Sequence, residues 1–294
     1  MGVFVAVALL TGCHPGNREA ITLRNECEAG SPTACNELGI RLLKGQYVLR
    51  DAPRGASLLR TACDSGVADG CMRLGVLYQE ARGVERDSSR AVMLLERGCS
   101  GGAMEGCSRL GLLHEQGRGV PREPARAGVL YAQACSGGFL KGCAQLAALH
   151  ESGAGVPLDT ARATALYQRA CTGKEHSGCV GLGRLYVAGA LPAPNDSSAA
   201  TLFRDACENG EASGCLALAQ LHETGRGATQ DFGRAAMLYR NACENRNGEA
   251  CYRLAELYDK GAGVRRNPEQ VARFRQRACE YGHALACPPP RNPQ

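Results

Sequence analysis

Apolar residues recur along the chain at helical spacing, in segments separated by glycine-rich loops. The segment that begins at Cys71 shows this pattern. Its apolar or small positions are Cys71, Leu74, Gly75, Leu77 and Tyr78, which share one face of a helix. Such segments end at loops with paired glycines, as in residues 117–120, and paired glycines interrupt helices. The pattern predicts one helix, called helix A, in each of these segments.

A second helical segment, called helix B, follows each loop. It opens on an acidic or amide residue at one fixed position, namely Asp51, Asp87, Glu123, Asp159, Asn195, Asp231 and Asn267. These side chains are typical N-caps. A calcium site is the alternative interpretation, but one carboxylate per repeat cannot supply the roughly six oxygen ligands that calcium requires. The positions of helix B that we expect to face the core are Leu58, Leu94, Leu130, Leu166, Leu202, Leu238 and Phe274.

The two helices together repeat every 36 residues. One leucine of helix A recurs in every period, as Leu38, Leu74, Leu110, Leu146, Leu182, Leu218 and Leu254. A fixed period of this length predicts an all-α solenoid of helix-turn-helix repeats. We expect the solenoid over residues 18–290, with seven full repeats in 28–279, half-repeat caps and a disordered tail at 291–294. Residues 191–198 diverge most, which suggests an irregularity between two regular arrays.

Sixteen of the 17 cysteines form eight C-x7-C pairs. The pairs are Cys27 and Cys35, Cys63 and Cys71, Cys99 and Cys107, Cys135 and Cys143, Cys171 and Cys179, Cys207 and Cys215, Cys243 and Cys251, and Cys279 and Cys287. Two residues eight apart on one helix lie roughly 12 Å apart, too far for a disulfide, so a bridged pair must span a turn between helices. Glycines such as Gly66 and Gly70 suit a left-handed helix end and a close backbone approach there.

Zinc is the competing interpretation of paired cysteines, but structural zinc sites use C-x2-4-C knuckles, which this sequence lacks. We therefore expect eight disulfides, no metal and no cofactor. Eight bridges indicate an oxidising compartment.

Composition and charge exclude several classes of protein. Charged residues make up 21% of the chain and apolar residues 44%, which fits neither a disordered chain nor a membrane bundle. The net charge of +5 is spread without a run of like charges, so we expect no nucleic-acid partner.

The repeated motif L-G-x-L-Y/H-E-x-G-x-G-V, followed by R-A-x-x-L-Y-x-x-A-C, resembles the Sel1-like repeat. With a C-x7-C pair in every period, the chain resembles the cysteine-rich Hcp type of this family. The resemblance implies a right-handed α/α superhelix, disulfides between helix B and the next helix A, and a role as an interaction adaptor. We expect a monomeric extracytoplasmic scaffold that binds a protein, a peptide or cell-wall material on its concave face.

If helix A lines that face, as in related repeats, its exposed stripe is polar and varied. The candidate binding residues are Arg73, Arg109, Arg184, Gln220, Arg253 and Glu256. The alternative function is binding or hydrolysis of β-lactams, a label carried by some similar proteins. The chain has no S-x-x-K motif, so we expect no catalytic residue. The recurring His114, His150 and His222 replace a tyrosine of other repeats, which favours a packing role.

The N-terminus resembles a bacterial lipoprotein signal. Residues 2–12 are mostly apolar and end in Leu-Thr-Gly before Cys13, the one cysteine outside the pairs. We expect residues 1–12 to be a signal peptide, Cys13 to carry lipid and residues 13–17 to be a tether. The lipid would be the only membrane contact and would hold the protein in the periplasm or at the cell surface, on the outer membrane. The alternative is a secreted soluble protein.

Overall fold

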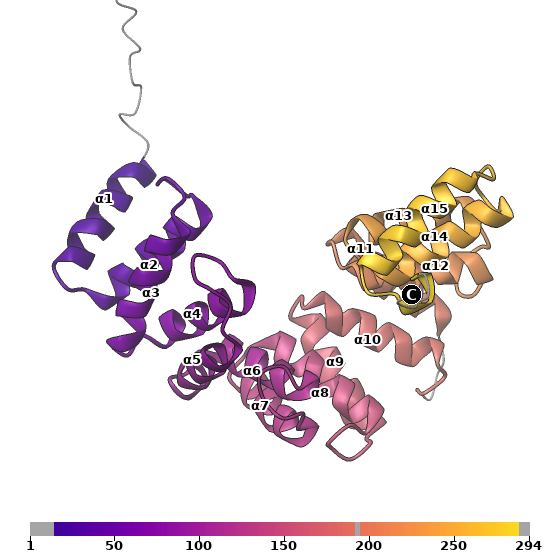
Figure 1. Cartoon of the computed structure of the whole chain (residues 1–294). Coiled ribbons are helices and arrows are strands. Elements are labelled where there is room, and N and C mark those ends of the chain that lie inside the picture. Colours follow the sequence, from indigo (N-terminus) through magenta and orange to yellow (C-terminus); the bar gives the residue numbers. More distant parts are fainter. Residues whose placement is uncertain (1–14, 192–194, 288–294) are drawn as a thin grey trace, which may run out of the picture. The chain divides into compact units, whose positions relative to one another are not determined.

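The computed structural model describes residues 15–191 and 195–287. All regular secondary structure in these residues is helical, which confirms the all-α prediction (Figure 1). The contacts between residues group the chain into two compact units that meet between residues 139 and 140. This boundary does not coincide with residues 191–198, where the sequence suggests an irregularity between two arrays. A solenoid repeat contacts only its neighbours, so any junction between repeats can separate two units.

The described part of the first unit contains seven helices. These are α1 (Pro15–Glu28), α2 (Pro32–Lys44), α3 (Ala52–Asp64), α4 (Ala68–Glu80), α5 (Ser88–Ser100), α6 (Met104–Gln116) and α7 (Pro124–Ser136). Even-numbered helices are A helices and odd-numbered helices are B helices. Each packs against its sequence neighbours within this unit, so that α4, for example, contacts both α3 and α5.

The described part of the second unit continues the same alternation. Its helices are α8 (Leu140–Ser152), α9 (Thr160–Thr172), α10 (His176–Val187), α11 (Asp196–Glu208), α12 (Ala212–Thr224), α13 (Phe232–Glu244), α14 (Gly248–Lys260), α15 (Pro268–Glu280) and the short 3-10 helix η1 (Ala284–Ala286). In Figure 1, α13, α14 and α15 lie side by side in orange to yellow, with α14 in contact with both neighbours. Neighbouring A helices also touch, as α10 does with α8 and α12.

The predicted N-caps begin the B helices. The Oδ1 atom of Asp87 accepts a hydrogen bond from the backbone N–H of Arg90 at 2.9 Å. The backbone N–H of Asp87 donates to the carbonyl of Tyr78 at 3.2 Å, so the same residue ties the loop to helix A. Glu123 is the exception, because its side chain makes no capping hydrogen bond.

The core confirms the helix A leucines and corrects the prediction for helix B. The leucine of helix A is buried in every repeat, from Leu38 at 3% exposure to Leu254 at 0%. In helix B, five of the seven predicted core residues are only half-buried, and Leu130 and Phe274 are the buried ones. The following residue is the more deeply buried in six repeats, namely Leu59, Leu95, Tyr131, Tyr167, Phe203 and Tyr239. These residues follow the first buried small residue of the helix by four positions, which centres them on its buried stripe.

For seven of the eight predicted disulfides, both cysteines belong to the same unit, and the structure contains all seven of these bridges. They join Cys27 to Cys35, Cys63 to Cys71, Cys99 to Cys107, Cys171 to Cys179, Cys207 to Cys215, Cys243 to Cys251 and Cys279 to Cys287. Six of them span the turn from a B helix to the next A helix, and the bridge from Cys279 to Cys287 joins α15 to the residue after η1. The two Cα atoms of each bridge lie 4.5–4.7 Å apart. The eighth pair has one cysteine in each unit, and the bridge from Cys135 to Cys143 stays a prediction.

The ends differ in detail from the predicted caps. Helix α1 begins at Pro15, so residues 15–17 belong to a helix and not to a tether. Proline suits the first helical turn because that turn leaves its N–H groups unbonded. Cys287 has an extended backbone after η1 and begins no A helix, as expected for a residue that precedes proline. Cys13, the rest of residues 1–14 and residues 288–294 lie outside the described residues.

None of the described helices combines the length and the hydropathy needed to span a bilayer.

Candidate functional site

In the first unit, the candidate residues Arg73 and Arg109 line one small pocket of 130 Å³. Arg73 lies on α4 and Arg109 on α6, and each guanidinium is held by a carboxylate one turn earlier. Arg73 Nε donates to Asp69 at 2.7 Å, and Arg109 Nε donates to Glu105 at 2.8 Å. The structure therefore brings these two A helices to one site, with their charges already paired.

In the second unit, Arg184 and Gln220 line a larger pocket of 560 Å³. Arg184 comes from α10 and Gln220 from α12. Half the lining is apolar, from Val180, Val187, Ala188, Phe203, Leu216, Ala217 and Leu221. The pocket thus combines an apolar floor with polar groups at its edge, which is the usual composition of a binding site.

Arg253 and Glu256, the last two candidates, join this pocket through Glu249. Gln220 Nε2 donates to Glu249 at 3.3 Å, and Arg253 lies 4.0 Å from Glu249 and 3.3 Å from Glu256. Burial disfavours the charged form of Arg253, but the carboxylates around it, Glu256 first, raise its pKa. The four candidates in this unit therefore form one continuous surface on α10, α12 and α14.

The sequence pattern missed Arg226, which lies in the loop after α12 and lines the same pocket. Its guanidinium contacts both carboxylate oxygens of Asp196 at 3.1 Å and donates to the carbonyl of Val187 at 2.9 Å. These bonds fix the rim of the pocket. The sequence contains this arginine between Gly225 and Gly227, but paired glycines by themselves predict only the end of a helix.

A second missed feature is a tyrosine–glutamate pair in three repeats. The hydroxyl of Tyr131 donates to Glu115 at 2.6 Å, and the pairs Tyr167–Glu151 and Tyr239–Glu223 repeat this bond. Burial, followed by the hydrogen bond to the carboxylate, raises the pKa of each tyrosine. Glu151 also accepts from Arg184 at 2.9 Å, so one pair supports the pocket edge.

The recurring histidines are buried, as a packing role requires. His114, His150 and His222 are 5–6% exposed. The Nδ1 atom of His150 lies 2.9 Å from the carbonyl of Pro157, and that of His222 lies 3.1 Å from the carbonyl of Thr229. In these two repeats the imidazole therefore holds the loop between the helices.

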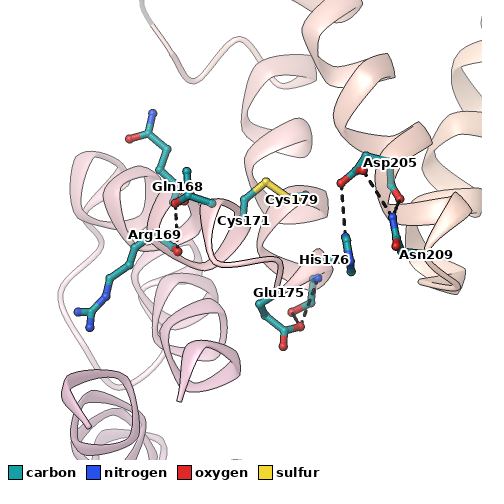
Figure 2. Close-up of a disulfide and its surroundings, with 10 residues drawn as sticks. Gln168, Arg169, Cys171, Glu175, His176, Cys179, Asp205 and Asn209 are labelled. Atoms are coloured by element: carbon teal, nitrogen blue, oxygen red, sulfur yellow. Dashed lines mark hydrogen bonds and ion pairs between the residues drawn. A yellow bond between two sulfur atoms is a disulfide. The ribbon is translucent and has the colours of Figure 1, made fainter. Parts of the chain in front are cut away.

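His176, Cys179 and Asp205 offer potential ligand atoms within 4.8 Å of one another. Figure 2 shows His176 pointing at Asp205, with 3.4 Å between Nδ1 and Oδ2, beside the bridge from Cys171 to Cys179. The sulfur of Cys179 is bonded to Cys171, so the oxidised protein offers only one imidazole and one carboxylate. Structural zinc sites use four ligands, and this cluster does not fit one.

The Sel1 repeat family model matches nearly the whole described chain. The matches cover residues 32–67, 68–102, 105–139, 140–174, 176–211, 212–247 and 248–283. No curated protein matches this chain significantly in sequence.

Solved structures share the fold. A protective antigen of uropathogenic Escherichia coli with an SLR fold has 26% sequence identity and a TM-score of 0.63, over 91% of this chain and 65% of the antigen. This chain thus spans just under two thirds of that protein. A Sel1 repeat protein from Oxalobacter formigenes has 22% identity and a TM-score of 0.71, over 83% of this chain and 96% of that one. An immunity protein from Pseudomonas aeruginosa has 16% identity and a TM-score of 0.55, over 75% and 84%.

Seven consecutive family matches, the 36-residue helix pairs and these structural neighbours agree with one another. The protein is a repeat scaffold, and its chain belongs to the Sel1 repeat family.

Proposed function

We propose that the protein is an extracytoplasmic scaffold that binds a segment of a partner protein on its A helices. The observation that carries this proposal is the 560 Å³ pocket between α10 and α12. Its apolar floor and charged rim match the composition of protein interfaces, in which a desolvated centre is surrounded by polar groups. The network from Gln220 to Glu256 extends the surface across α14.

Substitutions in the floor of the pocket test this proposal. Leu216 lines the pocket and is half-buried, so Leu216→Glu places a charge where the partner would bury apolar surface. The matched control is Met237→Glu on α13, because Met237 is 67% exposed and does not line the pocket.

Oxidised wild-type protein and both variants would be used to capture partners from an envelope extract of the source cells. We expect Leu216→Glu to lose a protein that wild type and Met237→Glu retain, while its helical circular dichroism is unchanged. Capture of the same proteins by all three contradicts the proposal.

The disulfides support the proposed compartment. Bridges persist in oxidising environments, and each short loop here contributes about 2.5 kcal/mol by the chain-entropy estimate. The proposed location is the periplasm or the cell surface, with Cys13 lipidated and held in the outer membrane.

Fractionation and mass analysis of the N-terminal peptide test the anchor. We expect Cys13→Ser to release a folded protein, because none of the predicted bridges uses this sulfur. Unmodified Cys13 in soluble wild-type protein would favour the secreted alternative. Turnover of a chromogenic cephalosporin by the same preparation tests the β-lactam alternative.

A further inference from the structure

A groove between consecutive B helices occurs at the same repeat position in both units. In the first unit it lies between α3 and α5, where Arg60 donates to the hydroxyl of Tyr78 at 2.9 Å. In the second unit it lies between α13 and α15, where Arg240 donates to the hydroxyl of Tyr258 at 2.6 Å. Corresponding residues are five periods apart, so the repeat itself builds this groove twice.

The two grooves differ in their charge. The first has a volume of 460 Å³, and Asp64 in it pairs with Arg97 at 3.4 Å. The second has a volume of 600 Å³ and contains a single carboxylate, Glu244. Its four guanidinium groups belong to Arg240, Arg265, Arg273 and Arg277. The second groove therefore has an excess of three positive charges.

Three of these arginines, Arg240, Arg273 and Arg277, contact aromatic side chains. Arg277 contacts the hydroxyl of Tyr281 at 3.4 Å, and the guanidinium of Arg273 lies 6.0 Å from the ring of Phe274. No ion pair between these four arginines and a carboxylate occurs among the described residues. The charges of all four are thus available to a ligand, while aromatic contacts limit the freedom of three of the side chains.

The lining of the second groove also includes apolar side chains. Val264 and Phe274 line it, and the ring of Tyr258 stacks on Phe274 with centroids 5.7 Å apart and an angle of 12°. Phe274 is 5% exposed, so its ring is not a free platform on which a nucleic-acid base could stack. The apolar groups line a groove and do not project, as insertion into a bilayer would require.

We propose that the groove between α13 and α15 binds an acidic peptide segment of a partner protein. Glutamate or aspartate side chains would contact the guanidinium groups, and an apolar side chain between them would lie against Val264 and Phe274. Arginine suits this ligand because its planar group can bind a carboxylate through two parallel hydrogen bonds. The site uses the B helices and is independent of the A-helix surface proposed above.

The test measures binding of a fluorescent peptide of alternating Glu and Leu to the purified, oxidised full chain. The control peptide has Gln in place of every Glu. The test variant is Arg265→Gln with Arg273→Gln, and the matched variant is Arg204→Gln with Arg275→Gln. The matched variant removes the same charge from exposed B-helix positions that do not line the groove.

We expect the test variant to weaken binding about tenfold or more, because it removes two charge-assisted contacts, and the matched variant to bind as wild type does. The affinity should also fall with rising salt. Equal loss in both variants, or equal binding of the Gln peptide, would overturn the proposal. The proposal would also be overturned if a single-stranded oligonucleotide or phosphatidylglycerol vesicles bound more tightly than the Glu peptide and lost this binding in the test variant. Leu216→Glu should bind the Glu peptide with the affinity of wild type, so the proposal for this groove and the proposal for the A-helix surface can be refuted separately.

Discussion

Tyrosines at two positions of the repeat have opposite electrostatic surroundings. Tyr131 and its equivalents in helix B are buried and donate to glutamates, which raises their pKa. Tyr78 in helix A accepts from Arg90 and Arg60, and these hydrogen bonds, that of Arg90 first, lower its pKa. The position of a tyrosine within the repeat thus determines whether the fold raises or lowers the pKa of its hydroxyl.

Alkaline pH is therefore expected to destabilise the fold. Tyr131, Tyr167 and Tyr239 ionise at their ordinary value of 10.0 in the unfolded chain and only at higher pH in the folded protein. Their contribution is complete below the unfolded value and is lost as the pH rises through the folded pKa. Urea unfolding at a series of pH values should show this loss. Tyr131→Phe should reduce the slope and, because Glu115 loses its donor, lower stability by about 1 kcal/mol near neutral pH. An unchanged slope would contradict the assignment.

Left-handed backbone at Lys174 provides a second test at this scale. Six equivalent turns have glycine at this position, such as Gly210 with φ of +85°, but Lys174 has φ of +67°. Lys174→Gly is expected to raise the free energy of unfolding by about 0.5–1 kcal/mol, because glycine adopts this conformation without steric cost. Denaturant unfolding measures the change. The reverse substitution Gly210→Lys, with open space around its Cα, should lower stability, and a gain there would refute the reason.

At the scale of elements, the approach of a B helix to the next A helix depends on small residues. A methyl group at Gly178 would lie 2.5 Å from Cβ of Ala170 and 3.0 Å from the backbone nitrogen of Cys171. Two repeats later, Ala250 occupies the same position and is fully buried. The disulfide and the small residue together fix how closely two helices pack.

Gly178→Ala is therefore expected to lower the free energy of unfolding by about 1–3 kcal/mol through overpacking. Gly233→Ala at the start of α13 is the matched control, because its nearest atoms lie at 3.3 and 3.6 Å. That control should cost much less than Gly178→Ala, because only the Asp231 carboxylate has to move slightly and alanine loses less entropy on folding. Thermal unfolding of the two variants checks the difference. A similar shift in both would show that the contact at Ala170 is unimportant.

At the scale of the molecule, each repeat depends on its neighbours through local contacts. Replacing Cys207 and Cys215 together by serine should loosen the junction of α11 and α12 and leave distant helices protected, because stability in a solenoid is a sum of local terms. Amide hydrogen exchange should show the deficit in residues near this junction. A uniform loss of protection would mean that the array unfolds as one cooperative domain.

The helices, the caps and the bridges could be predicted because each depends on residues close in sequence. A period of 36 residues, an acidic or amide residue at the start of each B helix and cysteines eight residues apart define local geometry, and the same pattern recurs in seven repeats. The shared face of Arg184, Gln220, Arg253 and Glu256 could also be predicted, because a position that recurs in each repeat falls on one face of a solenoid.

Only the tertiary structure decided how these positions combine. It placed the deepest core residue of helix B one position later than the leucine pattern suggested, since burial depends on the neighbouring helices. It brought Arg226 to the pocket through Asp196, 30 residues away, and joined Tyr131 to Glu115 across two helices. It left Arg265 and Arg273 without a carboxylate partner among the described residues. The sequence determined this protein's repeat because local spacing is periodic, but the pairing of charges and the shape of each groove arise from contacts between helices.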